Sequence, residues 1–412
     1  MWSDGAEFRL MAGGPLDGIK VVDQTTIVVG PVCSRTLADH GADVIKVEAP
    51  GGDLLRTMAH GSRNPGMSGK FLNFNRNKRS ICLDLKKPDG LEAMKRLITE
   101  ADIFVSNVRP QGLERASLDF ASLRTTNPRL IYCSIVGFGK GGRYYNRPAY
   151  DPIIQSVSGV AATLHRATGE PRFVPMVMTD HTSGLIAAQA IGFALFRREK
   201  TGVGEAIEVP MFENMASFVT SEHMGAATFE PPVGPTGDGR LLSPHYRPLP
   251  TKDGYITVGP NTDAQAFAFF EAIGEPELKT DPRFDSAASR TANAEEYFQV
   301  RIAGLARKTT AEWLDIFEKR DVPAQRYNTI EDLLVDPHLE DVGFYTQETH
   351  PSEGEIRRTR PANTFSGGHR EDLRHAPLLG EDTRGVLVEA GYSATEIQAM
   401  LESGAVKAAE GL

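Results

Sequence analysis

The sequence predicts an α/β protein built on a parallel sheet and followed by a smaller α+β region. Short apolar strand patterns alternate with helix patterns through the first third of the chain, and this alternation is typical of a parallel sheet. The chain has 412 residues, which is too long for one small domain and favours two. A proline-rich stretch over residues 228–250 separates two regions of different texture and is interpreted as a linker.

The first elements form a β-α-β unit. Residues 19–24 predict a buried strand, a helix opens at Gly30-Pro31 and stops at Gly41, and residues 43–47 predict the next strand. Only Gly30 stands where dinucleotide-binding folds require three glycines. A nicotinamide cofactor is therefore disfavoured.

Later segments extend the same alternation. An amphipathic pattern predicts a helix over residues 89–101. Apolar runs predict strands over residues 80–85, 102–107, 130–136 and 205–211. Because ligands of open α/β sheets bind beyond the carboxyl ends of the strands, polar and basic residues there are candidate contacts.

Asp180 is the central candidate residue. It follows an apolar run over residues 174–178 and precedes a helix pattern from Gly184 to Arg198. One interpretation is a helix cap, because a short side-chain oxygen can accept an orphan backbone N–H. The other is a nucleophilic carboxylate at a strand-to-helix junction, fixed yet reachable. An unperturbed aspartate has a pKa of ~3.9, so ionised Asp180 is expected at neutral pH.

The region after the linker predicts a small α+β unit. It begins with a strand over residues 253–259 and continues with helices over 264–273, 294–307 and 310–320.

Composition limits the function classes. The chain is 40% hydrophobic and 24% charged with a net charge of -9, which is ordinary for a soluble protein and gives no general attraction to nucleic acid or acidic membranes. No uncharged apolar run approaches the ~20 residues of a membrane span. The cysteines at positions 33, 82 and 133 fit no metal or redox motif. We expect a cytoplasmic protein without a metal or a permanently bound cofactor.

Several ordered motifs resemble the class III coenzyme A transferases, the CaiB/BaiF family that includes formyl-CoA transferase. They are Tyr150-Asp151, Asp180-x-x-x-Gly184 and Lys200-Thr-Gly-x-Gly204, together with N-x-N-K-R-S-I-x-L-D-L over residues 75–85 and N-x-R-P over residues 107–110. The resemblance covers nearly the whole chain.

The resemblance implies roles for individual residues. Asp180 matches the nucleophile that becomes acylated, and Asp151 matches a supporting carboxylate. The positions that border coenzyme A in relatives match Ile27, Val28, Leu83, Lys86, Asn107, Val108, Arg109, Arg115 and Tyr150. Some relatives carry glutamine at position 28 and arginine at position 49, so contacts to the nucleotide end differ here. Backbone N–H groups near Gly184 or Gly259 are expected to stabilise the reaction's oxyanions.

The resemblance also implies an architecture. A Rossmann-like large domain is formed from both chain ends, with residues 1–227 as its first part and residues 331–412 as a return segment with C-terminal helices. Residues 228–330 form the linker and the small α+β domain, and two subunits interlock as a homodimer. Residues 258–261 stand where relatives have a glycine-rich lid, with a single glycine.

The expected function is transfer of coenzyme A from an acyl-CoA thioester to a free carboxylic acid through an aspartyl acyl-enzyme. The alternative is an acyl-CoA epimerase or racemase of the same superfamily. Those enzymes place a histidine where Tyr150 stands, although His181 is a conceivable substitute base. A protein that binds coenzyme A without catalysis is a further alternative. The expected partners are acyl-CoA, a carboxylic acid and a second subunit, with no nucleic acid and no membrane.

Overall fold

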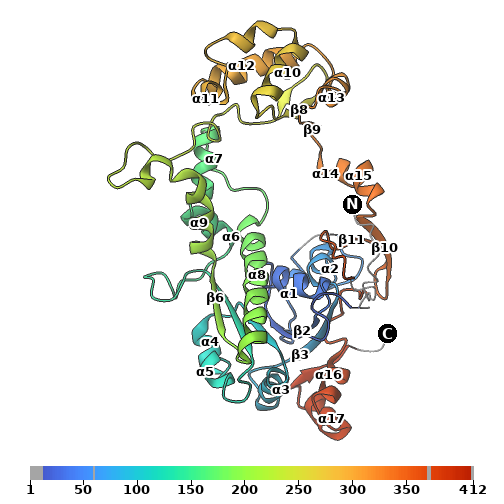
Figure 1. Ribbon diagram of the computed structural model, residues 1–412. Helices are drawn as coiled ribbons and strands as arrows, with labels where there is room; N and C mark the ends of the chain where they lie inside the picture. The colour runs from blue at the N-terminus through green and yellow to red at the C-terminus, as the bar shows by residue number, and fades with distance from the viewer. Residues whose placement is uncertain (1–12, 59–60, 369–372, 410–412) are drawn as a thin grey trace. The chain divides into compact units, whose positions relative to one another are not determined.

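The computed structural model of the protein describes residues 13–58, 61–368 and 373–409, which form two compact units (Figure 1). The first unit takes the described residues up to Ser158, Val174–Ser217 and those from Val342 onward. The second takes Gly159–Phe173 and Phe218–Asp341. The chain therefore leaves the first unit twice and returns to it each time.

A seven-stranded sheet forms the centre of the first unit, in the order β12-β3-β2-β1-β4-β5-β6. Every neighbouring pair is parallel except β12, which runs antiparallel to β3. The predicted α/β class with a parallel sheet is confirmed. The strands are β1 (Lys20–Gln24), β2 (Asp43–Glu48), β3 (Lys78–Leu83), β4 (Ile103–Ser106), β5 (Ile131–Val136), β6 (Ala206–Pro210) and β12 (Val406–Lys407). The strand order reverses direction between β1 and β4, and open α/β sheets bind ligands at such a switch point.

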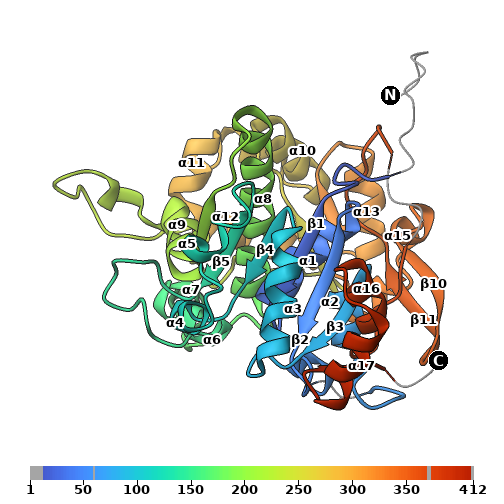
Figure 2. The same cartoon turned by 90° about the horizontal axis from the view of Figure 1, so that it is seen from below.

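Helices cover both faces of the sheet. One face buries a hydrophobic cluster beneath α3 (Pro88–Thr99), α4 (Pro110–Arg115), α5 (Phe120–Leu123), α16 (Thr383–Glu389) and α17 (Ala394–Glu402), as Figure 2 shows for α3, α16 and α17. The elements outside this group are α1 (Val29–Asp39), α2 (Gly69–Asn75), α6 (Asp151–Val157), α8 (Met178–Thr201) and α9 (Met211–His223). Helix α8 packs closely against α1. Only glycine fits at position 184, because any side chain there would bring its Cβ within 2.5 Å of the Val29 carbonyl oxygen.

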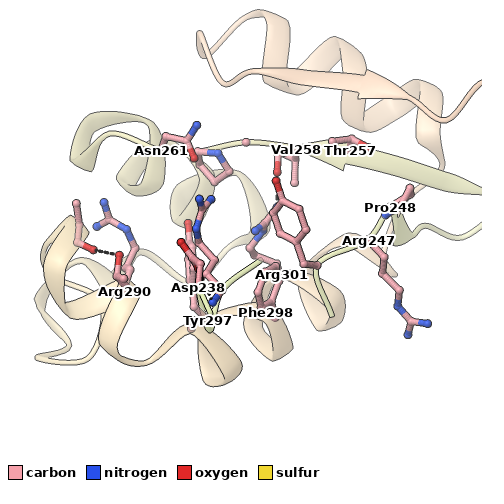
Figure 3. Close-up of a pocket in the computed structure, with 17 residues that line it drawn as sticks. Asp238, Arg247, Pro248, Thr257, Val258, Asn261, Arg290, Tyr297, Phe298 and Arg301 are labelled. Carbon is pink, nitrogen blue, oxygen red and sulfur yellow. Dashed lines mark hydrogen bonds between the residues drawn. The ribbon is translucent and has the colours of Figure 1, made fainter. Parts of the chain in front are cut away.

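The second unit is a small α+β structure. Its antiparallel sheet consists of β7 (Leu249–Pro250), β8 (Tyr255–Val258) and β9 (Ala324–Arg326). Its helices include α7 (Val160–Thr168), α10 (Asp263–Ile273), α11 (Ala287–Ala292), α12 (Ala294–Leu305) and α13 (Thr310–Glu318). The three helices predicted here end within two residues of α10, α12 and α13. An aromatic core holds them together, with Trp313 and Phe317 stacked at 5.2 Å between ring centroids. A cavity of about 730 Å³ lies in this unit (Figure 3).

Short elements complete the described chain. They are the single-turn segments η1 (Leu54–Arg56), η2 (Gly225–Thr228) and η3 (Pro276–Thr280), the helices α14 (Ile330–Leu333) and α15 (Pro337–Asp341), and the antiparallel pair β10 (Tyr345–His350) and β11 (Gly354–Thr359). Among residues 13–58, 61–368 and 373–409, no helix is both long enough and apolar enough to cross a membrane.

Candidate active site

The segment before Asp180 is irregular, so the predicted strand-to-helix junction at Asp180 is wrong. Residues 174–177 belong to no helix or strand, with bends at Pro175 and Met176, and α8 begins at Met178. The backbone of this segment bonds to one side chain instead of a sheet. Gln155 Oε1 accepts from the Val174 N–H at 2.8 Å, and Gln155 Nε2 donates to the carbonyls of Val174 and Met176 at 3.4 and 3.3 Å. An apolar run alone could not reveal this partner, which comes from α6.

Asp151 supplies the cap that the sequence suggested for Asp180. Its Oδ1 accepts from the backbone N–H groups of Thr179 at 2.8 Å and Asp180 at 3.3 Å, and from Thr179 Oγ1 at 2.7 Å. Its Oδ2 accepts from Gln155 Nε2 at 2.7 Å. Asp151 is 4% exposed. This buried carboxylate therefore orients the first turn of α8, where anionic groups are favoured.

The carboxylate of Asp180 is left without a donor. The residue is 7% exposed, the cap position of α8 belongs to Val177, and no described residue donates a hydrogen bond to the Asp180 side chain. Burial, and secondarily the negative charge of Asp151, raise the pKa of Asp180 to about 7. The expectation of a fully ionised side chain at neutral pH is therefore wrong, because desolvation disfavours the charged form.

The backbone donors expected to stabilise oxyanions are already engaged. At the start of α8, the N–H groups of Met178 and His181 bond to the carbonyls of Met176 and Val177 at 2.8 and 3.1 Å. Gly184 lies within the helix interior, where each N–H bonds one turn back. In the second unit, the Gly259 N–H bonds to the Pro323 carbonyl at 2.8 Å. These N–H groups therefore already have acceptors, and stabilisation of oxyanions by backbone groups near Gly184 or Gly259 stays a prediction.

The ring of His181 is half-buried. It packs against Phe74 with 5.4 Å between ring centroids. Burial and the positive charge of Arg35 lower its pKa, against an opposing effect of Asp151. These surroundings disfavour the imidazolium form.

The turn after β1 lies at the switch point of the sheet. The Thr26 N–H donates to Asn107 Oδ1 at 3.1 Å, and Asn107 Nδ2 donates to the Thr26 carbonyl at 3.0 Å. The turn is strained, because Ile27 has φ 69°, a value that β-branched residues rarely adopt. Val28 is 4% exposed and packs in one cluster with Ile27 and Val177. The predicted residues 27, 28 and 107 are thus close together, beside the start of α8.

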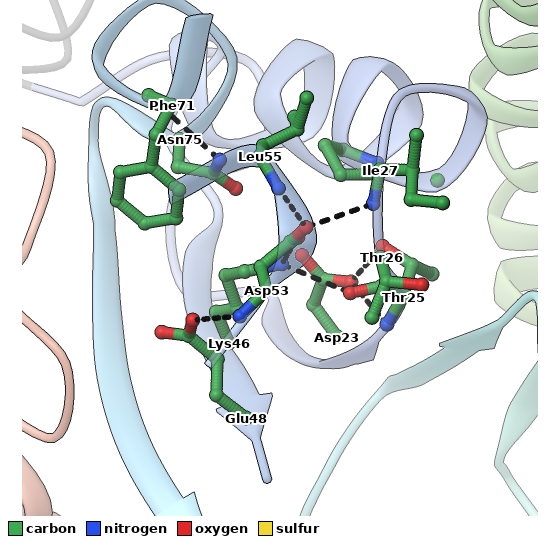
Figure 4. Close-up of polar contacts among 12 residues, drawn as sticks. Asp23, Thr25, Thr26, Ile27, Lys46, Glu48, Asp53, Leu55, Phe71 and Asn75 are labelled. Carbon is green, nitrogen blue, oxygen red and sulfur yellow. Dashed lines mark hydrogen bonds and ion pairs between the residues drawn. The ribbon is translucent and has the colours of Figure 1, made fainter. Parts of the chain in front are cut away.

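A buried charge pair fixes this turn (Figure 4). Asp53 Oδ1 accepts from the N–H groups of Ile27 at 3.1 Å and Leu55 at 2.9 Å. Asp53 Oδ2 accepts from Lys46 Nζ at 2.8 Å, and that ammonium also donates to the Thr25 carbonyl at 2.9 Å. Both side chains of the pair are 0% exposed. Sequence reasoning missed Asp53 and Lys46, although a lysine inside the apolar run DVIKV was a usable clue.

Four other residues predicted to border coenzyme A follow strands β3 and β4 in the chain. Val108 and Arg109 follow β4 and are exposed, and Arg115 lies in the last turn of α4. Lys86 is exposed beyond β3, two strands from β1. The side chains of Lys86, Arg109 and Arg115 make no hydrogen bond or ion pair with a described residue.

Two predicted residues have contrasting exposure. Leu83 is 0% exposed within the core, whereas Tyr150 is 61% exposed at the start of α6 and adjoins Asp151.

Within the described residues, no group of three or more histidine, cysteine, aspartate or glutamate side chains could hold a metal ion. The three cysteines are free and buried.

Known proteins match this chain over most of its length. The sequence profile described as CoA-transferase family III matches residues 16–383. The succinyl-CoA:glutarate CoA-transferase of Mus musculus is 31% identical over 409 residues, covering 99% of this chain and 94% of that protein. The formyl-CoA:oxalate CoA-transferase of Escherichia coli is 32% identical over 426 residues, covering 95% and 99%. The crystal structure of a CaiB/BaiF family protein from Brucella suis matches with a TM-score of 0.77 at 31% identity, covering 92% of this chain and 100% of that chain.

Proposed function

Because the chain belongs to CoA-transferase family III and is therefore a CoA-transferase, we propose that Asp180 carries the acyl group while coenzyme A moves from an acyl-CoA thioester to a free carboxylic acid. The observation that carries this proposal is the contrast between two neighbouring carboxylates. Asp151 has both oxygens engaged in hydrogen bonds, whereas the carboxylate of Asp180 accepts none from a described residue. A nucleophile needs such an unoccupied lone pair.

The raised pKa of Asp180 favours this role. A carboxylate with a pKa of about 7 is more basic than a solvated aspartate and remains half ionised near neutral pH. Holding it against the thioester can supply an effective molarity of roughly 10⁵–10⁸ M. Water around a more exposed carboxylate would weaken both effects.

The proposed reaction runs in four substitutions. An ionised Asp180 oxygen attacks the thioester carbonyl, the carbon–sulfur bond breaks, and a mixed anhydride and the coenzyme thiolate form. The thiolate attacks the Asp180 carbonyl carbon and releases the first acid, leaving an aspartyl thioester. The acceptor carboxylate attacks that thioester and again expels the thiolate. The thiolate then attacks the acceptor's acyl carbon, which gives the new acyl-CoA and restores Asp180.

We place the coenzyme at the switch point between β1 and β4. The strained turn at Ile27 and Val28 and the exposed residues Val108 and Arg109 border this edge. The cations Lys86, Arg109 and Arg115, which pair with no described residue, suit its phosphates, because guanidinium and ammonium groups bind phosphate oxygens strongly.

We also propose a homodimer. Helix α8 leaves an apolar stripe on its surface, with Leu185 51%, Phe193 66% and Phe196 64% exposed. These residues recur at helical spacing beside Gly192, which allows close approach of another backbone. The family resemblance implies that a second copy of the chain covers this stripe.

The cytoplasm remains our predicted compartment, and the three buried free thiols are compatible with it.

The epimerase alternative is not favoured. Moving the α-proton of an acyl-CoA requires two acid–base groups on opposite faces. Asp151 is committed to the first turn of α8, and the pKa of His181 is lowered.

Mass spectrometry of products from a panel of acyl-CoA donors and mixed carboxylic acids tests the proposal. A new acyl-CoA formed by the wild type and not by Asp180→Asn supports it, whereas α-deuterium exchange without transfer contradicts it.

A further inference from the structure

The hydroxyl of Ser183, three residues after Asp180, is buried and makes no hydrogen bond. Ser183 is 0% exposed, and its Oγ bonds to no residue that the structure describes. Other hydroxyls in the helices of this unit donate to the carbonyl four residues earlier, as Ser158 does at 2.7 Å and Thr182 at 2.8 Å. Ser183 makes no such bond, and buried polar groups without partners are rare in folded proteins. This donor is therefore available to a group that forms during the reaction.

Ser183 and Asp180 share one buried face of α8. The buried residues of this face are Asp180, Ser183, Gly184 and Ala187. Side chains three residues apart on a helix are neighbours, with roughly 5–6 Å between their Cβ atoms. Helical side chains also lean towards the N-terminus, so the side chain of Ser183 leans towards the turn that holds Asp180. Rotation of these two short side chains brings the hydroxyl within hydrogen-bond reach of an Asp180 oxygen.

The other donors around Asp180 are engaged. Thr179 Oγ1 donates to Asp151 Oδ1 at 2.7 Å, and Thr182 Oγ1 donates to a backbone carbonyl at 2.8 Å. The backbone N–H groups of Thr179 and Asp180 donate to Asp151 Oδ1 at 2.8 and 3.3 Å. Of the three hydroxyls in residues 178–184, all of which the structure describes, only that of Ser183 has no acceptor.

Two of the four proposed substitutions place negative charge on Asp180 itself. When the coenzyme thiolate attacks the Asp180 carbonyl carbon, the carbonyl π electrons move to the oxygen, and this oxyanion collapses as the first acid leaves as a carboxylate. When the acceptor carboxylate attacks the aspartyl thioester, a second oxyanion forms on the same carbon and collapses as the thiolate leaves. A buried oxyanion is stabilised by a hydrogen-bond donor that is already in place.

We propose that the Ser183 hydroxyl donates a hydrogen bond to the Asp180 oxygen in these two oxyanions. The proton stays on the serine oxygen throughout, so the hydroxyl stabilises charge and does not act as an acid. In the free protein the Asp180 carboxylate accepts no hydrogen bond from a described residue. The bond therefore forms along the reaction and lowers its barrier without stabilising the ground state. This inference rests on the proposed function, because it gives Ser183 a part in the steps at Asp180.

Kinetics and unfolding of the full-length Ser183→Ala variant test the proposal, with the acyl-CoA and the carboxylic acid that give the fastest turnover in the product screen. The kcat for transfer should fall by roughly 10²-fold, the usual effect of removing one oxyanion donor. The KM for acyl-CoA should stay unchanged. The denaturation midpoint should not fall, because the variant removes a buried hydroxyl without a partner and introduces a better helix former.

Mass spectrometry of the intact, acid-quenched protein during the first turnover identifies the affected step. The wild type should carry coenzyme A as the aspartyl thioester. Ser183→Ala should instead carry the acyl group of the mixed anhydride, because the attack of the thiolate on Asp180 is slowed. The same adducts in the same proportions in both proteins would contradict the assignment of Ser183 to these steps.

Thr182→Val is the matched control, because it removes the adjacent hydroxyl of α8, which already bonds to a backbone carbonyl, and keeps the shape of the side chain. Its kcat should equal that of the wild type. A wild-type kcat in Ser183→Ala, or equal losses in Ser183→Ala and Thr182→Val, would overturn the proposal. A denaturation midpoint that falls together with kcat in Ser183→Ala would show a structural role instead.

Asp180→Asn separates this inference from the proposed function. If Asp180→Asn keeps near-normal turnover, the proposed function fails, and the role of Ser183 fails with it. If Asp180→Asn is inactive and Ser183→Ala is fully active, only the role of Ser183 is wrong.

Discussion

Replacing Asp180 by asparagine should stabilise the folded protein, and the gain should increase with pH. Burial and the charge of Asp151 raise the pKa of Asp180 from 3.8 to about 7. Below the lower value the carboxyl is protonated in both the folded and the unfolded states. Between the two values the unfolded chain releases its proton first, so the free energy of unfolding of the wild type falls as pH rises. Above the upper value the loss is complete and constant.

The size of the effect follows from the two pKa values. From 3.8 to about 7, at ~1.36 kcal/mol for each pH unit, the ionised carboxylate destabilises the fold by roughly 4 kcal/mol. Roughly 3 kcal/mol of this loss develops between about pH 5 and about pH 8. Asparagine carries no charge at any pH, and the Asp180 carboxylate accepts no hydrogen bond from a described residue. The change in the stability difference with pH therefore isolates the charge.

Denaturant unfolding of the wild type and Asp180→Asn at about pH 5 and about pH 8 measures this change. Asp119→Asn is the control, because hydrogen bonds from Ser122 lower the pKa of Asp119 against the opposing effect of burial. Its stability difference from the wild type should be the same at both pH values, which lie above its titration. In the wild-type enzyme, kcat/KM should also rise through about pH 7 as Asp180 ionises. An unchanged stability difference for Asp180→Asn at the two pH values would refute the raised pKa.

Three further predictions address the coenzyme site and the dimer. Asp53→Asn leaves Lys46 buried without its carboxylate partner and should lower the free energy of unfolding by roughly 3–5 kcal/mol; a wild-type denaturation midpoint would show that the pair is not required. Arg115→Ala should weaken coenzyme A binding by roughly tenfold and reduce its salt dependence, and an unchanged affinity in titration calorimetry would reject the contact. Phe193→Glu should give a monomer by light scattering, while Val388→Glu, which also alters an exposed apolar residue (60% exposed), should not. A dimeric Phe193→Glu would exclude the α8 stripe as the interface.

Elements defined by local pattern were predictable from the sequence. Helix α12, for example, begins at Ala294 as predicted and ends two residues before the predicted boundary. The parallel sheet followed from the alternation of strands and helices, and the family resemblance from its ordered motifs. These features depend on residues close together in the sequence, which is why periodicity and motif spacing could reveal them.

Features that depend on distant residues were not predictable. The apolar run before Asp180 gave no indication that Gln155 would bind its backbone, or that Asp151 would cap α8 from 28 residues earlier in the chain. The ionisation of Asp180 depends on burial, which a linear sequence does not report. The same limit applies to Lys46, whose partner Asp53 became evident only once both side chains were placed in the fold.

Trapping the acyl-enzyme tests the central claim most directly. The wild type is incubated with an acyl-CoA, quenched with hydroxylamine, digested and analysed by mass spectrometry. We predict a hydroxamate on the peptide that contains Asp180, and none in Asp180→Asn, which should still fold and bind coenzyme A. A hydroxamate on another carboxylate such as Asp151, or near-normal turnover by Asp180→Asn, would contradict the assignment of Asp180 as the nucleophile.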